Sequence, residues 1–184
     1  MISREIAVKL LNDNIQNANM IKHCLASEAV LRAIAGKLGY DLDEWGIAGL
    51  LHDIDVEVTN ADPYKHGPHA AVMLEGMLSP EALDAIVMHN EVATGKERTT
   101  IFQHAVAAGE TITGLIMATA LVYPDKKLAS VKVKSITKRM KEKAFAASVK
   151  RENILECEKI GIPIDAFAEL SLTAMQQISD DLGM

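Results

Sequence analysis

The residues most able to do chemistry follow the apolar segment 46–51. His52 and Asp53 come directly after this segment, and Asp55 follows two positions later. Charged groups are costly to bury unless they are paired. Taken alone, the fragment fits two descriptions: a polar cluster with a function, or a histidine stabilised by the negative end of a helix with acids that face water.

Two further polar residues have apolar neighbours. His23 lies close to the apolar face of its expected helix, where a lone histidine is more often a core residue than a ligand. Glu110 is the one carboxylate in the stretch 105–118, among the most apolar in the chain. A buried carboxylate needs a cation. With His52 and Asp53, the set provides two imidazoles and two carboxylates from three helices, which can satisfy one another around a metal ion.

This ordered set resembles the metal-binding motif of the HD superfamily of metal-dependent phosphohydrolases, and the sequence His-Asp-Ile-Asp is similar to its HDIG subgroup. The resemblance covers about residues 18–122. It implies an all-α fold in which His23, His52 and Asp53 bind one divalent metal together with a later aspartate. Glu110 stands at the position of that aspartate, and its side chain is one methylene longer.

Two more histidines fit the two-metal members of the superfamily. His66 precedes an expected helix start at Pro68, and His89 lies near the end of the expected helix 80–90. The resemblance implies that Asp53 bridges two metals, the second of which has His66 and His89 as its outer ligands. We therefore expect one or two divalent ions as cofactor. Histidine and carboxylate ligands favour Mn, Fe, Co, Ni or Zn over Mg.

The activity that the resemblance implies is hydrolysis of a nucleotide or other small phosphoester by a metal-activated water, with His52 and Asp53 at the catalytic centre. Two alternatives stay open. Some HD proteins use a similar histidine-rich cage to hold two iron ions and activate oxygen, which the presence of His66 and His89 would permit. A non-catalytic binding or signalling domain could also retain the fold, and glutamate in place of aspartate at residue 110 favours that alternative.

A basic segment extends over residues 126–151, which contain ten of the 19 Lys and Arg residues and a single acid. Most charge runs of this kind are solvated helix faces. If the chain hydrolyses phosphoesters, part of the segment can bind the substrate phosphate. Arg139 and Arg151 are the first candidates because guanidinium groups bind phosphate with two parallel hydrogen bonds. Lys143, four residues after Arg139, and Lys65 are further candidates.

The turn signals and the apolar periodicity predict an all-α protein. Pro68 and Pro80 stand where the first turn of a helix needs no N–H group, and Thr100 with Gln103 has the spacing of a capping box. The expected helices cover residues 3–14, 18–38, 42–52, 68–78, 80–90, 100–122, 130–148, 151–160 and 164–182.

The composition indicates one domain. The chain has 184 residues, of which 49% are hydrophobic and only 4% aromatic, so the core must be aliphatic. We expect a single HD-type helical bundle over residues 1–184. Its core would span about residues 18–122, and a basic C-terminal helical extension would span about residues 123–184.

We expect a cytoplasmic protein that acts on a small phosphorylated substrate. The uncharged stretch 111–124 is shorter than the roughly 20 apolar residues that a bilayer span requires. The N-terminal residues lack the apolar stretch of a secretion signal. Cys24 and Cys157 are isolated, as is usual in a reducing compartment. A net charge of −6 makes nucleic acid an unlikely partner, and the oligomeric state stays open.

Overall fold

The computed structural model describes all 184 residues and contains helices without strands, which confirms the predicted all-α class. The helices are α1 (Arg4–Asn14), α2 (Ala18–Leu38), α3 (Leu42–Leu51), α4 (Pro68–Met73), α5 (Pro80–His89), α6 (Glu91–Thr94), α7 (Ile101–Leu121), α8 (Val133–Met140), α9 (Arg151–Leu155), α10 (Ile164–Gln177) and α11 (Ser179–Leu182). Two single 3₁₀ turns, η1 (Leu128–Ser130) and η2 (Glu156–Glu158), complete the list.

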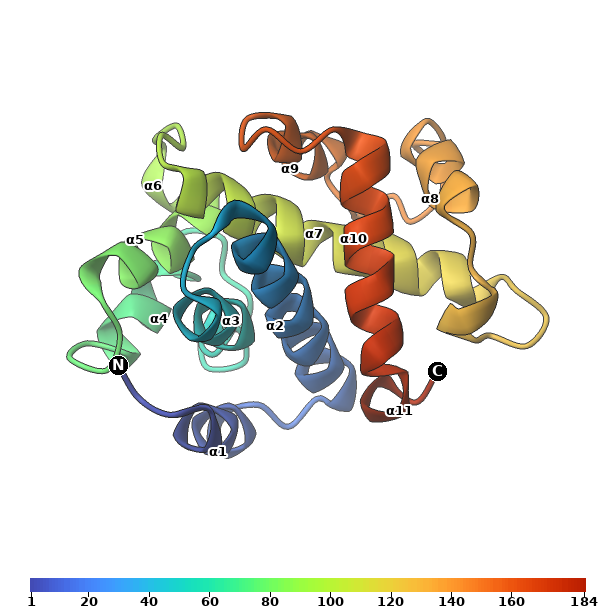
Figure 1. The fold of residues 1–184 in the computed structure, drawn as a ribbon. Coiled ribbons are helices and arrows are strands. Elements are labelled where there is room, and N and C mark those ends of the chain that lie inside the picture. Colours follow the sequence, from blue (N-terminus) through green and yellow to red (C-terminus); the bar gives the residue numbers. More distant parts are fainter.

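Helix α7 forms the centre of the fold, and α2 and α10 cross it (Figure 1). It begins with the predicted capping box, in which Thr100 and Gln103 exchange side-chain and backbone hydrogen bonds. By length and composition alone α7 could cross a membrane, but 72% of its most apolar window is buried inside the fold. The apolar residues of α7 therefore belong to the core.

Glycines let the three helices that carry the predicted ligands approach closely. A Cβ atom at Gly49 in α3 would lie 2.8 Å from the backbone oxygen of Ser27 in α2. A Cβ atom at Gly109 in α7 would lie 2.5 Å from the side chain of Leu31 in α2. Since real Cβ atoms do not come this near to a backbone atom, α2 packs on α3 as closely as it does only because residue 49 is glycine. At residue 109 a Cβ atom would displace the end of the Leu31 side chain.

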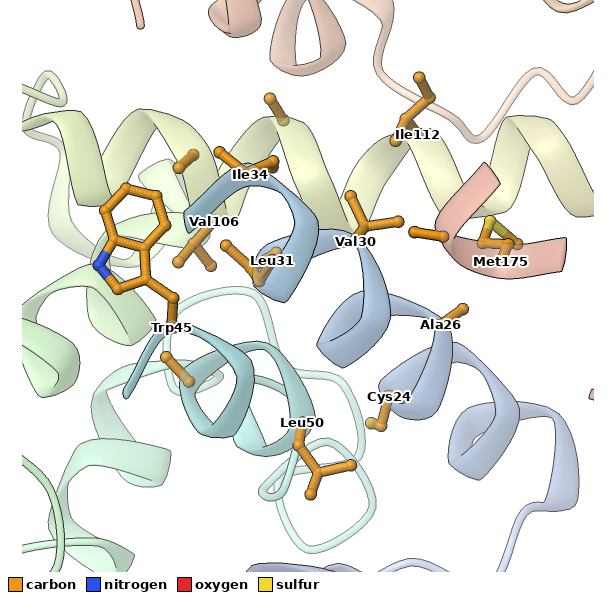
Figure 2. Close-up of a cluster of buried hydrophobic side chains, with 14 of the residues drawn as sticks. Cys24, Ala26, Val30, Leu31, Ile34, Trp45, Leu50, Val106, Ile112 and Met175 are labelled. Carbon is orange, nitrogen blue, oxygen red and sulfur yellow. The ribbon is translucent and has the colours of Figure 1, made fainter. Parts of the chain in front are cut away.

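The core is a single cluster of buried apolar side chains that extends from α1 to α11. Figure 2 shows its centre, where Leu31 and Ile34 of α2 lie between residues of α3 and α7. The ring of Trp45 in α3 stacks with those of Tyr40 and Phe102. The aliphatic core follows from the composition, and it holds α2, α3 and α7 in fixed relative positions.

The observed helices differ from the expected ones mainly in the basic segment. The helix expected over 130–148 is wrong beyond Met140, because residues 141–149 form turns. The guanidinium of Arg151 donates hydrogen bonds to the carbonyls of Ala146 and Val149, among others, which stabilises these turns instead of a continued helix.

Three smaller differences occur elsewhere. The short helix α6 was not expected, and the expected helix 68–78 ends at Met73, before Gly76, whose φ of 74° is left-handed. The expected helix 164–182 is interrupted at Ile178, between α10 and α11.

Candidate metal centre

The carboxylate of Asp53, just after α3, is surrounded by four imidazoles. Its Oδ1 atom lies 3.1 Å from Nε2 of His66, 3.3 Å from Nε2 of His52 and 3.4 Å from Nε2 of His89. Its Oδ2 atom lies 3.5 Å from Nε2 of His23. The structure thus brings together five of the six predicted metal ligands, with Asp53 at the centre.

Backbone carbonyls fix the orientation of two of these imidazoles. Nδ1 of His52 lies 2.8 Å from the carbonyl oxygen of Gly49, one helical turn earlier in α3. Nδ1 of His89 lies 2.5 Å from the carbonyl oxygen of Ile86 in α5. A carbonyl can only accept a hydrogen bond, so Nδ1 carries the proton in both rings and Nε2 presents its lone pair to Asp53.

Asp55 fixes the orientation of His66. Its Oδ1 atom lies 2.7 Å from Nδ1 of His66, and its Oδ2 atom accepts hydrogen bonds from the backbone N–H groups of Gly67 and Ala70 at 2.9 and 3.0 Å. Asp55 is fully buried. The sequence places it two residues after Asp53 but does not reveal this role, because the turn between residues 52 and 67 brings the partners together.

His23 is held by a residue that the sequence did not single out. Nδ1 of His23 lies 3.0 Å from Oγ1 of Thr113, whose hydroxyl donates to the backbone carbonyl of Glu110 at 2.6 Å. The hydroxyl proton is therefore used, and Thr113 accepts the proton of His23. The spacing of Thr113 and Glu110, three residues apart on one helix, is the only signal in the sequence for this contact.

Glu110 faces the same centre from α7 but stands slightly apart. Its Oε2 atom lies 3.8 Å from Nε2 of His23, and the hydroxyl of Thr111 donates to its other oxygen. Glu110 is not a member of the two groups whose ligand atoms all lie within 4.8 Å of one another. Burial raises the pKa of this carboxyl above its usual range.

The ligand atoms form two groups that share Asp53. One group contains His23 and His52, and the other contains His66 and His89. The two Nε2 atoms are 3.2 Å apart in the first group and 3.0 Å apart in the second. Two ligand atoms at about 2.1 Å from one metal, at bond angles near 90 to 109°, lie roughly 3.0 to 3.4 Å apart. The donor set and its spacing therefore fit divalent metal ions, and Asp53 could serve as a ligand in either group.

The electrostatics of the centre also favour a cation. Burial lowers the pKa of His52 to about 3. Burial alone would raise the pKa of Asp53, but the surrounding imidazoles, His52 first, hold it well below its usual range. Burial also opposes a charge on His66, yet hydrogen bonds to Asp53 and Asp55 raise the pKa of His66 to about 10. The two carboxylates thus stabilise a positive charge at His66, which a metal ion can replace.

A pocket of about 320 Å³ opens over the two groups. Beside the ligand residues it is lined by Asn90, Thr111, Gly114, Ser148, Val149, Lys150 and Asn153. Lys150 is the one lysine or arginine side chain among the lining residues. Ser148, Lys150 and Asn153 reach the pocket because the basic segment turns back toward α7, and no sequence motif indicates that turn.

The two arginines that we expected to bind phosphate do not line the pocket. Arg139 forms an ion pair with Glu142, and its guanidinium lies 4.2 Å from the centre of the Phe145 ring. Arg151 uses its guanidinium N–H groups for backbone carbonyls of the preceding turns. The structure differs from the expectation because both guanidinium groups are engaged by contacts within the basic segment.

The two lysines expected at the phosphate do not line the pocket either. Lys143 is exposed in the turns after α8, and Lys65 lies 3.5 Å from Asp62 with most of its side chain in solvent. Lys150, seven residues after Lys143, is the lysine that lines the pocket.

Comparison with protein-family models gives a match to the family described as HD domain over residues 20–120. The match covers more than half of the chain and contains all six predicted metal ligands: His23, His52, Asp53, His66, His89 and Glu110. Comparisons with curated proteins and with solved structures gave no match.

Proposed function

Because the chain belongs to the HD domain family, we propose that it is a metal-dependent phosphohydrolase that cleaves a nucleotide or another small phosphoester. The observation that carries the proposal is the convergence of four imidazole Nε2 atoms on Asp53 at a pocket that also contains a lysine. Histidine and carboxylate ligands around a shared carboxylate suit two-metal hydrolysis of phosphate esters.

The two groups of ligands define the expected metal sites. His23 and His52 would hold one ion, with Glu110 beside them, and His66 and His89 would hold the other. Asp53 would contact both. A divalent ion bound there lowers the pKa of its water to about 7 and withdraws charge from a phosphoryl oxygen.

The remaining residues of the site orient the metal ligands or bind the substrate. Asp55 and Thr113 keep the protons of His66 and His23 on Nδ1, so that Nε2 stays free to bind a cation. The ammonium group of Lys150 attracts the phosphate, and the amide of Asn153 can donate a hydrogen bond to the substrate. The amide of Asn90 donates to the backbone carbonyls of Pro63 and His66, so it shapes the wall of the pocket. No serine, cysteine or lysine nucleophile is needed.

We propose a small phosphorylated molecule as the partner and the cytoplasm as the place of action. The pocket has a volume of about 320 Å³, which suits a small molecule, and most of its lining residues are polar. Cys24 and Cys157 are both buried and free, which suits a reducing compartment.

Metal analysis of the purified protein combined with an activity screen tests the proposal. The protein is loaded with Mn²⁺, Fe²⁺, Co²⁺, Ni²⁺ or Zn²⁺ and assayed with nucleoside phosphates, sugar phosphates and a chromogenic phosphate monoester. We expect release of phosphate with several metals and none from Asp53→Asn. Oxygen uptake with tightly held iron would instead support an oxygenase, which the paired histidines also suit. Metal binding without either reaction would indicate a non-catalytic domain.

A further inference from the structure

Arg98 is a buried arginine at the end of the helix that carries His89. Its side chain is only 3% exposed. Its Nε atom donates to the carbonyl of Met88 at 2.8 Å, and its Nη2 atom donates to the carbonyl of His89 at 2.7 Å. The last carbonyls of a helix have no partner within the helix, and a cation is favourable there. Arg98 therefore caps the C-terminal end of α5, next to His89.

The other side of the guanidinium contacts the C-terminal extension. Its Nη1 atom lies 3.4 Å from Oδ1 of Asn153 in α9, 3.4 Å from Oε2 of Glu91 and 3.6 Å from Oε1 of Glu156. Glu156 is also bound by His104 of α7. A buried arginine is tolerated when such partners compensate its charge. The contacts join the extension to the loop after α5.

Two partners of Arg98, Asn153 and Glu91, connect it to the wall of the pocket. Asn153 lines the pocket directly. Glu91, which binds Arg98 with one oxygen, lies 3.5 Å from Nζ of Lys150 with the other. Lys150 is the lysine that faces the pocket. One guanidinium is thus connected to a ligand of the second group on one side and to two pocket residues on the other.

We propose that Arg98 is a positioning residue that holds the second metal group and the outer wall of the pocket in one arrangement. The inference rests on the proposed function, since it assumes that His66 and His89 bind a metal. Arg98 does not touch the metal or the substrate. It fixes the backbone of His89, whose ring is already bound to Ile86, so that Nε2 stays directed at Asp53.

Metal titration of Arg98→Met tests this inference. With Mn²⁺ as the probe, we expect wild-type protein to bind two ions. Arg98→Met should bind the ion at His23 and His52 as wild type does. It should bind the second ion, at His66 and His89, about 10- to 100-fold more weakly, which is the range found when partners of metal ligands are removed. Arg151→Met is the matched control, because Arg151 is also buried and bound to carbonyls, but none of these carbonyls belongs to a predicted metal ligand. It should retain both ions.

A double mutant separates positioning from general damage. In a His89→Ala background the second ion is already lost, so Arg98→Met should cause no further change in metal affinity. If Arg98→Met does not fold, the same metal titration is carried out on Arg98→Lys. It keeps the charge beside Glu156 but lacks the planar fork that reaches two carbonyls, so the second ion should still bind more weakly.

The outcomes distinguish this inference from the proposed function. If wild-type protein binds no Mn²⁺ or other divalent ion, the proposed function fails, and the inference with it. If wild type binds two ions and both Arg98 variants that fold also bind two with unchanged affinity, the inference is wrong and the function stands. An equal loss of both ions would likewise contradict selective positioning.

Discussion

The two histidine pairs around Asp53 are held in place by different forces. His23 lies in the 21-residue helix α2 and His52 directly follows α3, so their separation is set by the packing of α2, α3 and α7. His66 lies in a turn and His89 at a helix end, where polar contacts from Asp55 and Arg98 determine their positions. Hydrogen bonds orient the rings of both pairs, but helix packing sets the spacing of the first pair, whereas side-chain hydrogen bonds also set the backbone positions of the second.

This difference predicts that the two histidine pairs respond differently to single substitutions. Many small packing contacts together position the first pair, so the loss of one polar group there has a limited effect. The second pair depends on a few directed hydrogen bonds, so a single substitution can release it. Asp53 belongs to both groups, and its loss should affect both pairs equally.

The largest effect is expected for Asp53→Ala. This change removes the oxygen atoms that both groups share, so the protein should bind neither metal. Because metal chemistry contributes several kcal/mol, activity should fall on the order of 10³-fold or more. Metal content measured on the purified variant and circular dichroism of its helices check this result. Wild-type metal content in the variant would refute the site.

Asp55→Asn should release the second pair alone. Two backbone N–H groups bind Oδ2 of Asp55, so the oxygen of the new amide must face them and its NH₂ group must face His66. The amide then donates to Nδ1, the proton moves to Nε2, and that atom can no longer bind a metal. We expect the second ion to bind about 10- to 100-fold more weakly.

Titration with Mn²⁺ and the chemical shifts of the imidazole nitrogens of His66 both report this change. The first ion should bind as in wild type. If both ions are retained with wild-type affinity, the hydrogen bond from Asp55 does not determine the tautomer of His66, and the contrast between the two pairs is lost.

Gly49→Ala should act on the first pair through packing. The added methyl group would lie 2.8 Å from the backbone of Ser27, so α2 and α3 must move apart. Overpacking of this kind costs about 1 to 3 kcal/mol and should weaken the first ion more than the second. Gly36→Ala is the control, because nothing lies within 4 Å of its Cβ position in α2. It should raise stability by up to about 1 kcal/mol.

Thermal unfolding of the two variants separates these effects. In a chain of this size, 1 kcal/mol corresponds to about 2 to 4 °C, so the melting temperatures should move in opposite directions. A Gly49→Ala protein as stable as wild type would mean that the close approach of α2 and α3 does not position His23.

Glu110→Gln should have a smaller effect than loss of Asp55. The carboxylate lies 3.8 Å from Nε2 of His23 and outside the compact groups, so its charge acts on the first ion from the edge of the site. Neutralising it should weaken the first ion by about tenfold, or roughly 1.4 kcal/mol, and leave the second unchanged. Glu110→Asp, which keeps the charge, is the control. Unchanged affinity in Glu110→Gln would show that Glu110 is not a ligand.

The contrast between the two histidine pairs also explains how much of the fold and of the site could be predicted from the sequence. Helix periods and caps predict α2, α3 and α7, and these helices bring His23, His52 and Glu110 to the same place. The family resemblance added His66 and His89. Asp55 was visible in the sequence, but its contact with His66 depends on the path of the turns between them.

Arg98 and Lys150 could not have been assigned from the sequence. The role of Arg98 depends on backbone carbonyls that have no side-chain signature. The basic segment was expected to be a helix, which would direct Arg139 and Lys143 alike toward one face. Turns stabilised by Arg151 direct Lys150 to the pocket instead. Local periodicity does not predict turns that are stabilised by hydrogen bonds from a side chain to backbone carbonyls.

The smallest effect is expected for Lys150→Met, which tests the outer wall. Lys150 faces the pocket, whereas Lys143, seven residues earlier, does not. Each substitution removes one positive charge from the same segment, so the pair separates position in the fold from overall charge. About half of the Lys150 side chain is exposed, so its attraction for a phosphate is screened by solvent.

An exposed charge pair of this kind contributes about 0.5 to 1 kcal/mol, so Lys150→Met should raise KM about two- to fivefold. The kcat value should change little, because the ammonium group attracts the phosphate before and during the reaction alike. The effect should shrink as salt is added, since ions screen exposed charges. Lys143→Met should leave KM unchanged. Steady-state kinetics at low and high salt measure both variants, and an equal rise in KM for the two would mean that the whole basic segment, rather than the pocket lysine, attracts the substrate.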